Sequence, residues 1–232
     1  SRNCCPRRRS WTAGTVLADD QGDQVMDRDR MHGIRDKLKQ LSQWETVSTF
    51  SREFYQLIAD RLADAGPPAS GLRLAFTDFL AVEVNYHRRL AAMASRDEMM
   101  ADDLQSLADK RRLNLDAVSE MVAMTPAPGC QLEALQHLIL AECHYHRRNT
   151  SQVVHHLQHA LGCENGHPLV QFALGYNIYA QAVQDYTVMK ISGGDGTLAV
   201  TDDIAFSSRC LAALNALEAG LSGGDFDAQV YW

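Results

Sequence analysis

Histidine is concentrated in one short part of this sequence, since seven of the nine histidines lie in residues 137–167. Imidazole and thiolate groups hold Zn²⁺, Ni²⁺ or Cu²⁺ when a fold brings three or four of them together. A helical hairpin that turns at residues 149–150 would do so, because it places residues 143–144 opposite residues 155–156. The candidate metal ligands are Cys143, His144, His155 and His159.

A second interpretation of the same residues needs no metal. In it His144 packs between two helices, while His155, His156 and His159 lie on the solvated outer face of the hairpin. The sequence contains no HExxH motif and no carboxylate placed as a hydrolytic base. We therefore predict no cofactor, no catalytic residue and no catalysis, and keep a metal-binding sensor or metal-dependent enzyme as the alternative.

Six cysteines are spread along the chain: Cys4, Cys5, Cys130, Cys143, Cys163 and Cys210. No two of them form a CxxC pair, which argues against a zinc ribbon, and a chain of this length does not need a secreted disulfide framework. We interpret them as buried free thiols.

The string GGDGT at Gly193 to Thr197 resembles the phosphate-binding loop of the diacylglycerol kinase and NAD kinase superfamily. In that superfamily strands and helices alternate before the loop, whereas helical patterns precede it here. A second SGGD at Ser222 to Asp225 lacks the following Gly-Thr. Both strings are better explained as helix stops followed by acidic N-caps.

Apolar residues recur at three- and four-residue steps through most of the chain, which is the period of amphipathic helices. We expect an all-α protein of about nine or ten helices, stacked as antiparallel hairpins. The strongest breaks are residues 66–68 (Gly-Pro-Pro) and 125–129 (TPAPG). The expected helices span residues 26–41, 42–65, 70–94, 95–112, 114–124, 130–148, 150–162, 168–185 and 201–221, with a further start near residue 226.

Two segments of the sequence are similar to each other. AVEVNYHRR at residues 81–89 and LAECHYHRR at residues 140–148 share Glu, Tyr, His and two Arg in register. The offset of 59 residues also separates Pro67 from Pro126. A duplicated helical unit in an α-solenoid of irregular pitch would produce this pattern.

A shorter period appears in the second half, where Leu140-Ala141 and Leu174-Gly175 are 34 residues apart. In that register residues 130–186 resemble a tetratricopeptide repeat, and residues 201–232 extend the resemblance. Val153, Leu157 and Ala160 fall on the small, large and small positions of the second helix. His137 and Gln171 stand where the family favours Trp, and Asn165 stands where it favours Pro.

The resemblance implies an irregular tetratricopeptide-like solenoid whose concave groove binds a peptide or a partner protein. The first helix of each hairpin would line such a groove. The residues expected to contact the partner are Asn85, His137, His144, Gln171 and Asn177. A third alternative is a regulatory domain of a larger protein, whose active part lies outside this chain.

Composition limits the classes of partner. A net charge of −7 argues against nucleic acid, and no apolar run approaches the roughly 20 residues of a membrane span. The basic first residues lack the apolar core of a signal peptide, so we expect a cytoplasmic protein. We divide the chain into a disordered or non-native tail (1–24), an N-terminal helical region (25–124) and a repeat-like region (130–232) that is truncated at its C-terminus.

Overall fold

The computed structural model describes residues 20–95, 101–163, 166–192 and 200–223, and within them it is helical. A short 3-10 helix, Pro67–Ala69, lies before α3. The prediction of an all-α protein is confirmed, with eight α-helices in the described residues. They are α1 (Asp20–Leu41), α2 (Thr49–Asp64), α3 (Ser70–Ala94), α4 (Ala101–Met124), α5 (Cys130–His146), α6 (Thr150–Cys163), α7 (Pro168–Ser192) and α8 (Val200–Gly223).

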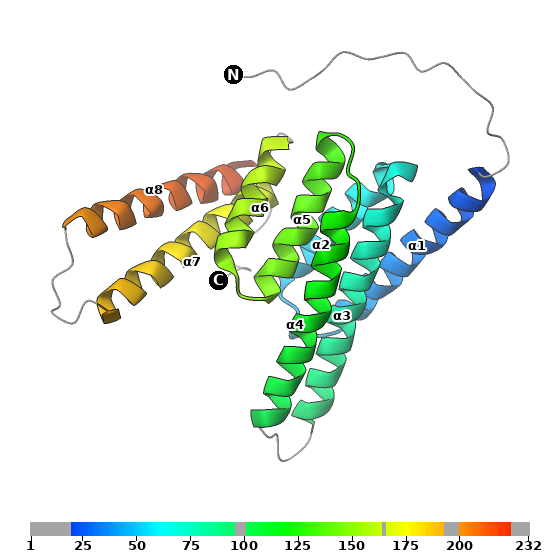
Figure 1. Cartoon of the computed structure of the whole chain (residues 1–232), viewed down its shortest axis with the longest axis horizontal. Coiled ribbons are helices and arrows are strands. Elements are labelled where there is room, and N and C mark those ends of the chain that lie inside the picture. The colour runs from blue at the N-terminus through cyan, green and yellow to red at the C-terminus, as the bar shows by residue number, and fades with distance from the viewer. Residues whose placement is uncertain (1–19, 96–100, 164–165, 193–199, 224–232) are drawn as a thin grey trace, which may run out of the picture.

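The first six helices form a bundle, and the last two form an arm. α1 packs along α3, α3 along α4, α4 on α5, and α5 along α6. The first part of α7 contacts α6, and the rest of α7 runs outward with α8 beside it (Figure 1). One continuous apolar core runs from Ile34 in α1 to Leu174 in α7, with Phe54, Phe76 and Phe79 at its centre. None of the described helices combines the length and apolar character that a bilayer span requires.

The glycine and proline residues that interrupt the helical pattern of the sequence set the ends of the middle helices. Gly66 has φ 68°, a left-handed conformation that glycine adopts without strain, and it separates α2 from α3. Arg73 of α3 reaches back over this break, where its guanidinium donates to Leu62 O (2.8 and 3.0 Å) and to Gly66 O (2.7 Å). One of the last carbonyls of α2 and the carbonyl of the break itself are thereby satisfied.

Two boundaries near the N-terminus differ from those predicted. α1 begins at Asp20, inside the segment assigned to a tail, and its Ile34 and Leu41 are buried against the neighbouring helices. The helix expected from residue 42 begins later than predicted, since Ser42 ends α1 by donating to Lys39 O (2.8 Å). The N-cap of α2 is Ser48, whose Oγ accepts from Ser51 N at 3.1 Å.

Two later helices are longer than predicted. α4 is continuous, although two helices were expected here with a break at residue 113, because Leu107, Leu115, Val118 and Val122 form one buried stripe along it. α7 extends beyond residue 185 because α8 lies beside it, with the rings of Tyr186 and Phe206 stacked at 4.5 Å. The GGDGT string and the helix start expected near residue 226 lie outside the described residues.

Candidate functional site

The two similar segments of the sequence meet in space. Glu83 and His87 are one turn apart on α3, and Glu142 and His146 are one turn apart on α5; Glu83 is fully buried. The Nε2 atom of His146 lies 3.6 Å from Glu83 Oε2 and 3.4 Å from Glu142 Oε2, and His87 Nε2 lies 3.7 Å from Glu83 Oε2. The internal similarity of the sequence therefore corresponds to one buried polar cluster between the two helices.

Arg111 of α4 supplies the counter-charge of Glu83. Its Nε donates to Glu83 Oε1 at 2.9 Å and its Nη2 donates to Glu83 Oε2, while the guanidinium lies 4.0 Å from the centroid of the Tyr86 ring. Nη2 is also 2.7 Å from His146 Nδ1. A guanidinium can only donate, so Nδ1 accepts and the imidazole proton of His146 is on Nε2, which faces the carboxylates.

Two hydroxyl groups extend the cluster to the first part of the chain. The phenol oxygen of Tyr55, on α2, lies 2.7 Å from His146 Nε2, and Thr46 Oγ1, before α2, lies 2.7 Å from His87 Nδ1. Sequence reasoning found the repeated Glu and His but missed Tyr55, Arg111 and Thr46, which come from segments without the motif. The complete polar cluster is Thr46, Tyr55, Glu83, His87, Arg111, Glu142 and His146.

The environment of the cluster shifts the pKa of three of its groups, Tyr55, Glu83 and Arg111, and the first two shifts show how the cluster is charged. Burial raises the pKa of Tyr55, and the nearby carboxylates of Glu142 and Glu83 raise it further. Burial would raise the pKa of Glu83 as well, but His146, His87 and Arg111 outweigh it and lower this pKa to about 2. Glu83 is therefore ionised at any ordinary pH and acts as the fixed negative charge of the cluster.

Glu142 differs from Glu83 because its bonding is incomplete. The residue is 5 % exposed, and its Oε2 has no hydrogen-bond partner among the described residues. His146 Nε2 lies 3.4 Å away but is not aligned for a hydrogen bond. A buried carboxylate oxygen that accepts no hydrogen bond is costly, so it marks a place where a bound group with an N–H or O–H would gain free energy.

Glu142 also lines an apolar hollow of about 270 Å³ between α2, α5, α6 and α7. The rings of Phe50, Phe54 and Phe172 form part of its wall, and Tyr145 and Tyr176 stand at its edge. A second hollow of about 320 Å³ shares Tyr145 and Tyr176 and is cationic, since Arg111, His146 and Arg148 line it. The other residues around the first hollow are Ser48, Ala141, Val153, Leu157, Ala173 and Asn177.

The residues predicted to contact a partner are divided among several places. Asn177 lines both hollows, and its Nδ2 donates to Ala173 O at 2.8 Å. Asn85 lines a separate depression between α3 and α4, and Gln171 is half-buried in the first turn of α7. His137 and His144 lie where α5 faces α6.

Five histidines form a continuous row along the outer seam between α5 and α6, which we call the histidine seam: His137, His144, His155, His156 and His159. Ring centroids of neighbouring members are 4.5–5.2 Å apart, and the Nδ1 atoms of His137 and His156 are 2.9 Å apart. Burial and adjacent cations lower the pKa of His144 to about 4 and that of His156 to about 3.

Cys143, the fourth member of the ligand set suggested by the sequence, lies apart from the histidine seam. Its side chain is fully buried in the apolar core, where burial raises the pKa of its thiol to about 12. The interpretation of the cysteines as buried thiols is correct for Cys143. Cys130 is exposed, and Cys163 and Cys210 are partly exposed.

No protein-family model matches this chain, and no curated protein or solved structure is significantly similar to it. The function is therefore inferred from the geometry of the polar cluster, the two hollows and the seam.

Proposed function

We propose that this protein is a scaffold that binds a peptide segment of a partner protein in the apolar hollow between α2, α5, α6 and α7. The observation that carries the proposal is a mostly apolar hollow whose lining includes Glu142, a buried residue whose Oε2 accepts no hydrogen bond within the described part of the chain. The edge of the hollow supports it, because Tyr145 and Tyr176 are 44 and 45 % exposed, and tyrosine is enriched in protein interfaces.

The hollow favours a particular anchor side chain. Its aromatic wall suits a ring, and Glu142 requires a hydrogen-bond donor, so a Trp or Tyr of the partner fits both demands. The adjoining hollow, with Arg111 and the exposed Arg148, favours an acidic residue next to that anchor. The expected ligand is thus a peptide that carries an aromatic anchor beside Asp or Glu.

The resemblance to tetratricopeptide repeats supports the same surface. It assigns the groove to the first helices of the hairpins, which are α5 and α7. These two helices supply Glu142, Tyr145, Phe172 and Tyr176 to the hollow. The proposed partner is thus a protein or a peptide, and the proposed location is the cytoplasm.

A peptide-library selection against the full chain tests this proposal. We expect a consensus with an aromatic anchor beside an acidic residue. Its affinity should fall at least tenfold in Ala173→Phe, which fills the hollow, and in Tyr176→Ala. Leu211→Ala, an exposed site on α8, should leave the affinity unchanged. Circular dichroism and thermal melting verify that each variant is folded.

Two results would refute the scaffold proposal. The first is the absence of any consensus from a library that yields one with a known peptide-binding control. The second is a consensus peptide that binds Ala173→Phe and Tyr176→Ala as tightly as it binds the unaltered protein.

A further inference from the structure

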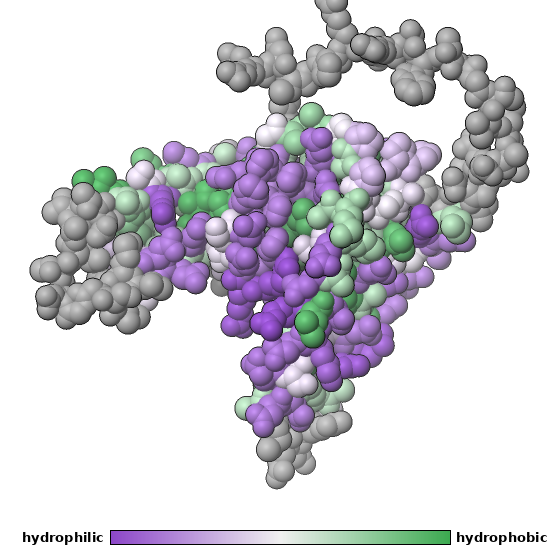
Figure 2. All heavy atoms as spheres, viewed as in Figure 1, coloured by the Kyte–Doolittle hydropathy of each residue, from purple (hydrophilic) through white to green (hydrophobic). Residues whose placement is uncertain are grey.

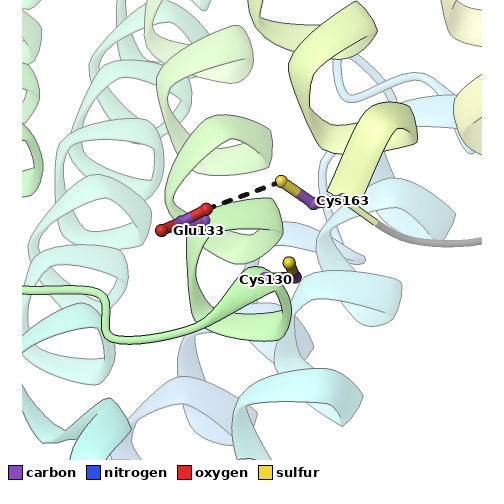
Figure 3. Close-up of side chains that lie close together, drawn as sticks. All are labelled: Cys130, Glu133 and Cys163. Atoms are coloured by element: carbon purple, nitrogen blue, oxygen red, sulfur yellow. Dashed lines mark hydrogen bonds between the residues drawn. The ribbon is translucent and has the colours of Figure 1, made fainter. Parts of the chain in front are cut away.

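A second site lies at the open end of the α5–α6 hairpin, away from the apolar hollow. Cys130 and Glu133 project from the first turn of α5, and Cys163 ends α6 (Figure 3). The Sγ atoms of both cysteines and a carboxylate oxygen of Glu133 all lie within 4.8 Å of one another. Cys163 Sγ donates to Glu133 Oε2 at 3.8 Å, so the side chains already converge.

These three donors match the coordination chemistry of zinc. Zn–S bonds of about 2.3 Å and Zn–O bonds of about 2.0–2.2 Å place tetrahedral ligand atoms roughly 3.5–3.8 Å apart. Small side-chain rotations would bring the three donor atoms from their present spacing to that spacing. Two thiolates favour Zn²⁺ or Co²⁺ over Mg²⁺ and Ca²⁺, and the exposure of Cys130 and Glu133 gives an ion access.

The histidine seam begins one helical turn from these donors. His137 follows Glu133 by four residues, and His159 precedes Cys163 by four, so each shares a helix face with a donor. The rings of His137 and His159 are stacked with centroids 5.0 Å apart. Each helix thus carries an imidazole one turn from the donors; neither is within 4.8 Å of all three donor atoms, so a side-chain movement would bring one of them to the fourth coordination position.

We propose that Cys130, Glu133 and Cys163 bind one Zn²⁺ ion, with an imidazole of the His137–His159 pair as the fourth ligand. The ion would join the first turn of α5 to the last residue of α6. The chain enters α7 five residues after Cys163, so the ion would also fix the point from which the arm departs. This site is independent of the proposed peptide binding.

Cobalt titration of the full chain, untagged and reduced with a phosphine, tests the proposal. Thiolate-to-cobalt charge transfer in the near ultraviolet reports sulfur ligands directly. We expect one equivalent of Co²⁺ with this band, displaced by Zn²⁺. Cys130→Ser and Cys163→Ser should abolish the band, and Glu133→Gln should weaken binding at least tenfold. Cys210→Ser, a partly exposed cysteine on α8, should match the unaltered protein.

Three outcomes would overturn the zinc proposal. Absence of the band in the reduced, folded protein would show that the donors do not bind the metal. Cobalt binding without the band, lost in His156→Gln, would place the ion on the histidine seam alone. A charge-transfer band that persists in Cys163→Ser would assign the sulfur ligand to another cysteine. Zn²⁺ should raise the melting temperature of the unaltered protein and not of Cys163→Ser.

Discussion

The bundle and the arm differ in where polar and apolar side chains lie. The bundle buries two carboxylates, a guanidinium and two imidazoles between α3, α4 and α5, and satisfies most of them internally. The arm leaves Ile204, Leu211 and Leu214 at least half exposed on α8, and Figure 2 shows hydrophobic surface there beside a hydrophilic α5–α6 face. The bundle also exposes Leu113 and Met124 of α4, but it alone contains the buried polar cluster, whereas exposed apolar side chains recur along α8 of the arm.

Removing one carboxylate charge in each region should give the largest difference in unfolding free energy between the bundle and the arm. Glu83→Gln leaves the guanidinium of Arg111 buried without a counter-charge, and should cost about 3–5 kcal/mol of unfolding free energy. Asp185→Asn breaks the Asp185–Arg209 pair of the arm, whose side chains are 44 and 51 % exposed, and should cost less than about 1 kcal/mol. Urea denaturation measures both, and equal costs would contradict the contrast.

Acid should reveal the same buried charge. The pKa of Glu83 is about 2 in the folded protein, whereas an exposed glutamate in the unfolded chain has a pKa of 4.5. As the pH falls, the unfolded chain therefore takes up this proton before the folded protein does. Its stabilisation is complete above pH 4.5 and is lost between pH 4.5 and 2. Tyr55, His87, Arg111, Glu142 and His146 surround the carboxylate from the four helices packed there.

In Glu83→Gln this part of the acid destabilisation, on the order of 3 kcal/mol, should disappear. Unfolding free energies of both proteins across pH 2–6 provide the measurement. Parallel pH profiles for the variant and the unaltered protein would show that Glu83 is not the group responsible.

Two glycine substitutions compare close packing in the arm with free space in the bundle. An added Cβ at Gly175 of α7 would lie 2.7 Å from Leu217 Cγ and 2.8 Å from Ala213 O of α8, so Gly175→Ala should destabilise by about 1–3 kcal/mol. Nothing lies within 4 Å of a Cβ at Gly33 of α1, and Gly33→Ala should stabilise by about 0.5–1 kcal/mol. Thermal melts distinguish the signs, and destabilisation by both would contradict the packing argument.

Local sequence signals were enough for the class of fold and for several boundaries. Gly66 and Pro168 mark a helix end and a helix start that the structure retains. Local signals failed at α4, where a new helix was expected at Asn114 although one buried apolar stripe continues along the whole helix. A single polar residue says little about a helix whose opposite face is covered by two neighbours.

The candidate sites depended on long-range packing that no spacing rule contains. The repeated Glu and His were visible, but Arg111 joins them only because α4 lies between α3 and α5 in space. Cys130 and Cys163 are 33 residues apart and match no metal motif, and only the length of the two hairpin helices brings them together. Cys143, by contrast, was favoured by its position near histidines and faces the opposite way, into the core.

The polar cluster has a further consequence for how the helices align. Apolar helices can slide along each other by a turn with modest loss, since one leucine replaces another in the contact. A slip of α5 by one turn would carry His146 about 5.4 Å along the axis, beyond hydrogen-bond reach of both Tyr55 and Arg111. The cluster therefore allows a single register between α2, α3, α4 and α5.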